Sequence, residues 1–318
     1  MKSLNPIIIL LRSMIIVYCF IGPLPSYAVD TVHQTRLFFE GPIYFIVSEY
    51  DSPIVSILKD KYAVEIIRYD DVIHSEFNQC IEEYRQKFVY LEGLKGRENL
   101  FIYGFERFFV LYNLMAQKNL TNVFFLELDN LIYDDPLRWE PAFCSRDISF
   151  MFDNYDRCAS GICFITSHTA LKIFTDHSIK YITETDHTKY FMTEMQSLDS
   201  YWKAYPTTVQ LLPTHWPSDK VPVETYSTYH MYDNTVFDSA GLGIYLGGVD
   251  PFHTNGIIMT GLRSIWSAID YSGYKFEWKM DSNGRNIPYV TGDQGTVRIN
   301  NLHIHSKSLM GCLSKYID

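Results

Sequence analysis

The sequence is poor in cysteine, in basic residues and in linker-like segments. Its 318 residues include six cysteines, and the CASGIC spacing of Cys158 and Cys163 fits neither a CxxC redox motif nor a zinc motif. Buried free thiols are therefore expected instead of a disulfide scaffold. With 27 basic and 37 acidic residues the formal net charge is −10, which excludes a nucleic-acid-binding protein with a broad basic face. Hydrophobic residues make up 47% of the chain, so it can bury a full core and disorder is excluded.

The first 28 residues have the pattern of a leader. Lys2 and Arg12 precede an apolar run over residues 13–22, and small residues follow up to Ala28. This order predicts a secretory signal peptide over residues 1–28 with cleavage after Ala28, or an uncleaved membrane anchor if the run begins at Pro6. Either case predicts an exported protein, secreted or in an ER–Golgi lumen, that meets a membrane only through this segment.

The remainder, residues 29–318, is expected to form one catalytic-size domain, because it contains no repeat, low-complexity tract or long linker. Its hydrophobic pattern predicts strands over residues 42–47 and 63–69 and helices over residues 77–90 and 105–120. A further strand, NVFFLELD, begins at Asn122. Strands that alternate with helices are typical of an α/β fold, with a Rossmann-like, mostly parallel sheet flanked by helices.

Two carboxylates close the last of these strands. Glu127 and Asp129 lie two residues apart, so on an extended backbone they project to the same face. Ligands of open α/β sheets bind beyond the carboxyl ends of the parallel strands, and Mg²⁺ or Mn²⁺ prefers oxygen ligands. The pair therefore predicts a site for a divalent cation, although a solvated strand end with acidic residues has the same pattern.

The C-terminal segment TVRINNLHIHSK, residues 296–307, is predicted to be a strand that ends in His303, His305 and Lys307. The two histidines face the same way on a strand, so one can ligate the metal while the other orients it or merely packs. Ser48 follows the first strand of the predicted domain, where a base and ribose would lie by the strand-end rule.

With these segments in place, the chain resembles the nucleotide-sugar-dependent glycosyltransferases of the GT-A fold. The resemblance lies in residues 105–130, 241–251 and 301–307. It implies a metal-binding DxD motif, in which Glu127 here replaces the first aspartate, and a late histidine as a further ligand. It also implies a donor of the UDP or GDP type with Mn²⁺ or Mg²⁺, and a phosphate contact from Lys307.

Further candidates come from the resemblance and from residue chemistry. Related transferases often keep an arginine where Arg107 stands, although an ion pair with the adjacent Glu106 is the plainer interpretation. Glu194 and Asp238 are the candidate catalytic or acceptor-binding carboxylates. Helix capping or surface charge would explain them equally well.

The predicted activity is metal-dependent transfer of a sugar from a nucleotide-diphosphate sugar to a glycan, protein or lipid acceptor. Such an enzyme needs the developing negative charge of its leaving group stabilised by a metal and a cation. Two other classes stay open. One is a secreted glycoside hydrolase, whose carboxylates would flank a bond about 5–10 Å apart. The other is a secreted carbohydrate-binding or effector protein on a degenerate transferase fold.

Overall fold

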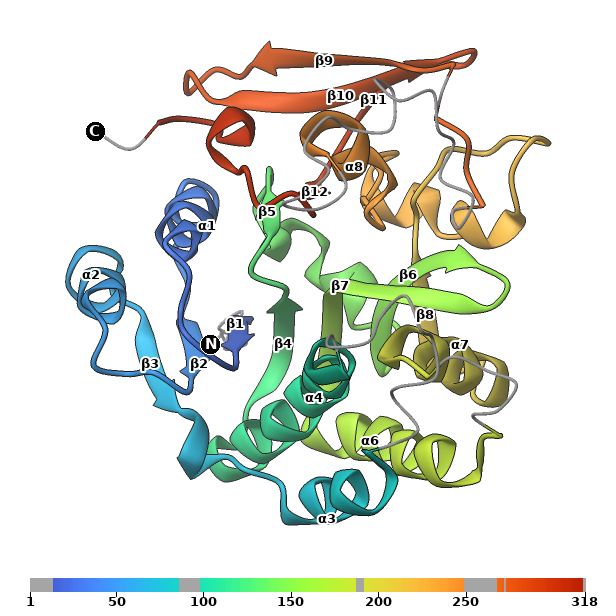
Figure 1. Cartoon of the computed structure of the whole chain (residues 1–318). Coiled ribbons are helices and arrows are strands. Elements are labelled where there is room, and N and C mark those ends of the chain that lie inside the picture. The colour runs from blue at the N-terminus through green and yellow to red at the C-terminus, as the bar shows by residue number, and fades with distance from the viewer. Residues whose placement is uncertain (1–13, 86–97, 187–191, 249–267, 272, 317–318) are drawn as a thin grey trace, which may run out of the picture.

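The fold is built on one large sheet with helices on both faces (Figure 1). The computed structural model describes residues 14–85, 98–186, 192–248, 268–271 and 273–316. Within these residues the large sheet has seven strands in the order β3-β2-β1-β4-β7-β6-β8. The strands are β1 (Ile15–Phe20), β2 (Ile43–Val47), β3 (Glu65–Arg68), β4 (Thr121–Leu126), β6 (Ile148–Asn154), β7 (Arg157–Ser167) and β8 (Val209–Leu212).

Most neighbours in this sheet run parallel. β1 pairs in parallel with both β2 and β4, β2 pairs in parallel with β3, and β6 pairs in parallel with β8. Only β7 runs against its neighbours β4 and β6 within the described sheet. The predicted α/β fold class, with a mostly parallel sheet flanked by helices, is therefore confirmed.

Helices cover both faces because successive side chains of a strand point to opposite faces. On β1, Ile16 and Tyr18 enter one hydrophobic core and Val17 enters the other. The first core packs against α1 and α2, and the second packs against α4, α6 and α7. The helices are α1 (Tyr27–Arg36), α2 (Pro53–Tyr62), α3 (Ser75–Tyr84), α4 (Glu98–Lys118), α6 (His168–Glu184) and α7 (Glu194–Ala204).

The apolar run of the expected leader is a strand inside this sheet. Residues 15–20 form β1, which lies between β2 and β4 and is paired with both. Ile16, Val17 and Tyr18 are completely buried. Cleavage after Ala28 would remove a central strand and the start of α1, so the predicted cleavage conflicts with this fold. Export of the protein stays a prediction, and residues 1–13 lie outside the described part of the chain.

Helix bounds differ modestly from those that periodicity predicts. α4 begins at Glu98, seven residues before the expected start at residue 105, and ends at Lys118. α3 covers Ser75–Tyr84, and the last residues of the expected 77–90 helix lie outside the described residues.

The shorter helices are η1 (Tyr69–Asp71), η4 (Pro136–Trp139), α5 (Glu140–Phe143), η5 (Val223–Thr225), η6 (Tyr229–Tyr232), α8 (Gly241–Gly247) and η7 (Met310–Cys312).

The C-terminal part forms two small sheets above the end of β4 (Figure 1). The first contains β9 (Lys275–Met280), β10 (Asn286–Gly292) and β11 (Gly295–Arg298), and the second pairs β12 (Asn301–His303) with β5 (Asn130–Ile132). The single strand predicted for residues 296–307 is wrong. β11 pairs with β10, whereas β12 turns to β5, and Lys307 has a left-handed φ of 64° that ends the extended run.

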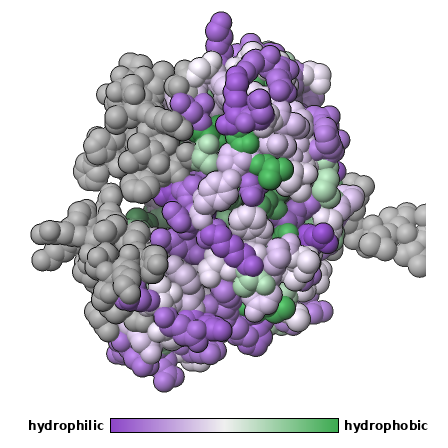
Figure 2. Space-filling view, turned by 90° about the vertical axis from the view of Figure 1, so that its right-hand side faces the viewer, coloured by the Kyte–Doolittle hydropathy of each residue, from purple (hydrophilic) through white to green (hydrophobic). Residues whose placement is uncertain are grey.

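The surface is mixed in character. Figure 2 faces the side that carries α7 and shows hydrophobic residues interspersed among hydrophilic ones. Among the described residues, no helix combines the length and apolar character that crossing a bilayer requires.

Candidate active site

A cavity of about 760 Å³ opens at the carboxyl ends of β1 and β4. This is the edge of a parallel sheet where a strand-end ligand is expected. Its walls come from the end of β1, from α1 and α4, from the β4–β5 link, from β6 and β7, and from the segments around α7, α8 and β12. Seven of the nine candidate site residues predicted from the sequence line this cavity: Arg107, Glu127, Asp129, Glu194, His303, His305 and Lys307.

An acidic pair and a histidine form the centre of the cavity wall. Nε2 of His303 lies 2.9 Å from a Glu127 carboxylate oxygen and 3.3 Å from an Asp129 carboxylate oxygen. One ligand atom from each of the three residues lies within 4.8 Å of the others. Burial by itself would lower the pKa of His303, but the carboxylates of Asp129 and Glu127 outweigh burial and raise it to about 10. The imidazole is therefore protonated while it contacts the two acids without a metal.

Backbone pairing between distant segments creates this cluster. The register of β5 with β12 sets Asn130 opposite His303, and the backbone N–H of Ile304 donates to the Asp129 carbonyl at 2.9 Å. Gly161 closes the far side, because a Cβ there would lie 2.5 Å from Asn130 Nδ2 and 2.7 Å from His303 Nδ1. A glycine is thus required for this approach of β7.

Arg107 connects the acidic pair to a third carboxylate. Its guanidinium forms ion pairs with Glu127 and, at 3.2 Å, with Glu194, and it donates to the Ser160 hydroxyl at 2.7 Å. The alternative partner Glu106 instead accepts from the Tyr69 hydroxyl. Burial raises the pKa of Glu127, but Arg107 and then His303 outweigh burial and hold it well below its usual range.

Glu194 begins α7, whose N-cap is Thr193. Its carboxylate packs so closely on α4 that a Cβ at Gly104 would lie 2.5 Å from a carboxylate oxygen. Burial raises the pKa of Glu194, and the Arg107 charge opposes that rise only in part. The structure therefore brings Glu194 to the cavity, next to the acidic pair.

His305 and Lys307 follow His303 around the same wall. The rings of His303 and His305 meet edge to face with centroids 4.3 Å apart. Burial, and then the charge of His303, lower the pKa of His305 to about 3, so this imidazole is neutral. The Lys307 ammonium contacts the second carboxylate oxygen of Asp129. Burial raises the pKa of Asp129, but His303 and then Lys307 outweigh it and hold that pKa well below the usual range.

Asp238 lies behind the cavity wall and holds backbone. One carboxylate oxygen accepts from the N–H groups of Ala240 and Leu242 at 2.9 and 2.8 Å. The other accepts from Gly243 at 2.7 Å and His303 at 2.9 Å. Four such bonds use the acceptor capacity of the carboxylate, so Asp238 fixes α8 against β12, consistent with the capping interpretation and not with a contact to a substrate.

Replacing Gly243 with alanine is expected to disrupt this junction. The new Cβ would lie 2.0 Å from the His303 carbonyl oxygen, and backbone cannot yield as a flexible side chain does. We expect a loss of about 1–3 kcal/mol of unfolding free energy and weaker metal binding, measured by urea denaturation and Mn²⁺ titration. Gly311→Ala is the matched control, because no atom lies within 4 Å of its Cβ position; equal stability of the two variants would contradict the expectation.

Ser48 does not reach the cavity. It lies after β2, where it accepts a hydrogen bond from the Gly22 N–H at 2.7 Å. The strand that does supply the cavity wall is β1, through Cys19 and Phe20, and Ile21 directly after it and Tyr27 of α1 also line the cavity. Sequence reasoning missed them because it assigned them to a leader, although IIVYCF also has the β-branched and aromatic content of a buried strand.

Asp153 and Arg157 are further cavity residues that the sequence did not single out. They lie on either side of the β6–β7 turn, and Arg157 Nε donates to an Asp153 carboxylate oxygen at 2.5 Å. Burial raises the pKa of Asp153, against the opposing charge of Arg157. An ion pair four residues apart across a turn is a common pattern, so the sequence alone carried no signal for it.

The donor set fits a hard divalent cation. Glu127, Asp129 and His303 offer two carboxylates and one imidazole to a common point, a combination that Mn²⁺ and Mg²⁺ accept. The same atoms are crowded by positive groups, Arg107 on Glu127 and Lys307 on Asp129. Because the His303 imidazole is protonated in this arrangement, a cation that binds to its nitrogen would displace that proton.

Comparison with known proteins gives structural likeness only. No family model and no curated protein matches the chain. Three similar solved structures are glycosyltransferases. Mouse xyloside xylosyltransferase 1, apo form, is 11% identical over 62% of this chain and 84% of that chain, with a TM-score of 0.46. PaToxG glycosyltransferase is 12% identical over 60% of this chain and 69% of that chain, with a TM-score of 0.36.

The third is the apo form of the glycosyltransferase GlyE of Streptococcus pneumoniae TIGR4. It is 12% identical over 60% of this chain, with a TM-score of 0.39, and the chain spans only 43% of its length. At TM-scores below 0.5 the likeness assigns neither a family nor a function to this chain.

Proposed function

We propose that the chain is a metal-dependent glycosyltransferase that uses a nucleotide-diphosphate sugar and a glycan, protein or lipid acceptor. One observation carries this proposal: Glu127, Asp129 and His303 converge within 4.8 Å at the carboxyl edge of a parallel sheet. The cluster lines a cavity of about 760 Å³, within the range of roughly 300–1,000 Å³ common for small-molecule sites.

The metal centre would be held by Asp129, Glu127 and His303, with Mn²⁺ or Mg²⁺ as the cation. A bound divalent cation supplies Lewis-acid stabilisation of the negative charge on the diphosphate leaving group. Lys307 adds a second positive charge at the same wall, and Arg107 adds a third. Fixed cations aimed at a developing charge lower the barrier without reorganisation at the moment of reaction.

The aromatic side of the cavity suits the nucleoside. Aromatic side chains from the end of β1, the start of α1 and the first turns of α4 line it: Phe20, Tyr27, Phe101 and Tyr103. Such side chains offer flat apolar faces to a base or a ribose. In this proposal Phe20 of β1, and not Ser48, contacts the base or the ribose of the nucleotide.

The opposite side of the cavity suits the hydroxyl groups of the transferred sugar and the acceptor. Glu194 and Asp153 line it, and burial raises the pKa of both carboxyls. Groups of this kind accept or donate hydrogen bonds to hydroxyls at neutral pH. Glu194, and not Asp238, is therefore the proposed carboxylate beside the reacting carbon.

Glycoside hydrolysis by the acidic pair is disfavoured. Ligand atoms of Glu127 and Asp129 lie within 4.8 Å, whereas retaining hydrolases keep their carboxyl groups about 5–5.5 Å apart and inverting ones about 6.5–9.5 Å apart. Both acids are also engaged by cationic side chains, which is unfavourable for a general acid. A binding protein on the same fold would also bind the donor in a metal-dependent way, but it would not transfer the sugar.

Calorimetric titration of the protein with UDP- and GDP-sugars tests the proposal. Saturable binding with Mn²⁺ that chelator abolishes is the expected result, followed by release of the nucleotide diphosphate when acceptor sugars are added. Folded protein that binds no donor with or without metal would refute a transferase site. Binding without release of the diphosphate from any acceptor would favour the binding protein.

A further inference from the structure

A second cavity lies on the other side of α4. It has a volume of about 480 Å³ and lies between η1, α3 and α4. Its apolar part is formed by Phe77, Ile81 and Ile102, which are 1%, 6% and 3% exposed. Phe77 stacks on Phe109 with ring centroids 4.4 Å apart, so this wall is anchored in a hydrophobic core.

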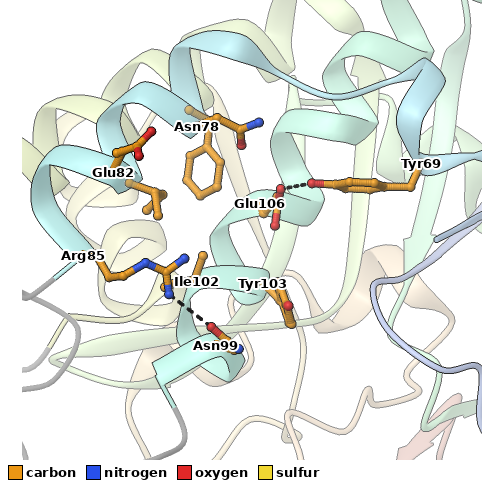
Figure 3. Close-up of a pocket in the computed structure, with 10 residues that line it drawn as sticks. Tyr69, Asn78, Glu82, Arg85, Asn99, Ile102, Tyr103 and Glu106 are labelled. Carbon is orange, nitrogen blue, oxygen red and sulfur yellow. Dashed lines mark hydrogen bonds between the residues drawn. The ribbon is translucent and has the colours of Figure 1, made fainter.

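A buried carboxylate points into this cavity. Glu106 is only 6% exposed and lines the cavity wall, and Figure 3 shows its side chain directed at Tyr69. One carboxylate oxygen accepts from the Tyr69 hydroxyl. Among the described residues the other oxygen accepts no hydrogen bond, and it is not one of the fully buried side-chain atoms that lack a partner. Solvent or a ligand in the cavity can therefore reach it.

Charges of both signs line the opening. Burial raises the pKa of Glu106, and the Tyr69 hydrogen bond and then the charge of Arg85 oppose that rise. Figure 3 shows Glu82, Arg85, Asn78 and Asn99 around the cavity, from α3, its end and the start of α4. Arg85 donates to the Asn99 side chain at 3.3 Å and forms no ion pair within the described residues. Glu82 and Glu106 disfavour an anion such as phosphate, and Arg85 disfavours a simple cation.

The remaining class of ligand is neutral and rich in hydroxyl groups. Carboxylates accept from hydroxyls, a guanidinium donates to them, and side-chain amides do both. Tyr69, Phe77 and Tyr103 add aromatic surface, which suits the apolar faces of a sugar ring. The volume falls within the range of roughly 300–1,000 Å³ of small-molecule sites.

We propose that the cavity between α3 and α4 binds a neutral sugar unit, with Glu106, Asn78 and Arg85 as its hydrogen-bonding groups. This site goes beyond the proposed function because it requires neither a metal nor a nucleotide. Tyr103 lines both cavities, so the second site lies beside the first and is separated from it by α4.

Methyl glycosides of glucose, galactose, xylose and N-acetylglucosamine are suitable probes. Full-length protein is titrated with each by calorimetry and by saturation-transfer NMR, in chelator and without nucleotide, so that the outcome does not depend on the transferase proposal. At least one glycoside is expected to bind with a dissociation constant on the order of 1 mM. Asn78→Ala and Glu106→Gln should each weaken binding about tenfold, as expected for a lost hydrogen bond.

Gln79→Ala is the matched control, because Gln79 is exposed on the same helix and does not line the cavity. It should leave binding unchanged. Asn78 is also exposed, so its substitution does not threaten the fold even if that of Glu106 does. The proposal is overturned if no glycoside binds the folded protein, if Asn78→Ala binds like the wild type, or if phosphate or ethanolamine binds in preference to every glycoside.

Discussion

A chain that begins at Val29 is expected not to fold, whereas a chain that begins at Ser13 folds. The shorter chain lacks β1, which pairs with β2 and β4 in the middle of the sheet. Complete burial of a large apolar side chain contributes about 1.5–3 kcal/mol. Ile16, Val17 and Tyr18, all completely buried, therefore account for a large part of the roughly 5–15 kcal/mol by which a domain is stable.

Removal of β1 also affects the backbone pairing of its neighbouring strands and the start of α1. Without β1, strands β2 and β4 both gain an unpaired edge, which promotes aggregation. α1 loses its first two residues, Tyr27 and the completely buried Ala28.

Expression of both chains, followed by circular dichroism and thermal unfolding, distinguishes the two cases. The chain from Ser13 should be soluble and unfold cooperatively, and the chain from Val29 should be insoluble or lack a transition. If the chain from Val29 is stable and unfolds cooperatively, the predicted cleavage after Ala28 would be supported. A different strand would then have to lie at the centre of the sheet.

Asp129→Asn is expected to abolish metal-dependent donor binding and any sugar transfer. The amide keeps the shape of the carboxylate but removes the charge that faces His303 and Lys307. Mutating residues that only support metal ligands typically costs 10–100-fold in affinity or activity. Loss of a charged ligand should therefore exceed about 100-fold in Mn²⁺ affinity, measured by calorimetry with the UDP- or GDP-sugar that binds the wild type.

Asp60→Asn is the matched control, because Asp60 is an exposed carboxylate on α2, remote from the cavity. It should behave like the wild type in every titration. Thermal unfolding of both variants in chelator checks that Asp129→Asn still folds. Metal affinity within threefold of the wild type in a folded Asp129→Asn variant would contradict a metal site at this cluster.

Local features of the site could be predicted well from the sequence. Glu127 and Asp129 follow a buried strand, and a strand end at the sheet edge is a local property of hydrophobic pattern and length. The helix before that strand was predicted for the same reason, although it begins seven residues earlier and ends two residues earlier than expected. Lys307 and His303 were singled out by residue type and by resemblance.

Features that depend on competing interpretations of one pattern could not be predicted. An apolar run of six to ten residues fits a signal core and a fully buried strand equally well, because both are selected for burial away from water. β1 was therefore assigned to a leader, and with it the cavity residues Phe20, Ile21 and Tyr27 were missed. Asp238 shows the same limit, since capping and catalysis both select an aspartate before a glycine-rich turn.

The sequence by itself determined the alternation of strands and helices and the carboxylate pair at the end of β4, since both follow from neighbours along the chain. Only the tertiary structure decided that β1 is central, that His303 meets Glu127 and Asp129 across more than 170 residues, and that Glu194 joins Arg107. The physical reason is that long-range pairing depends on which surfaces remain to be buried after the local elements have formed. No single segment carries that information.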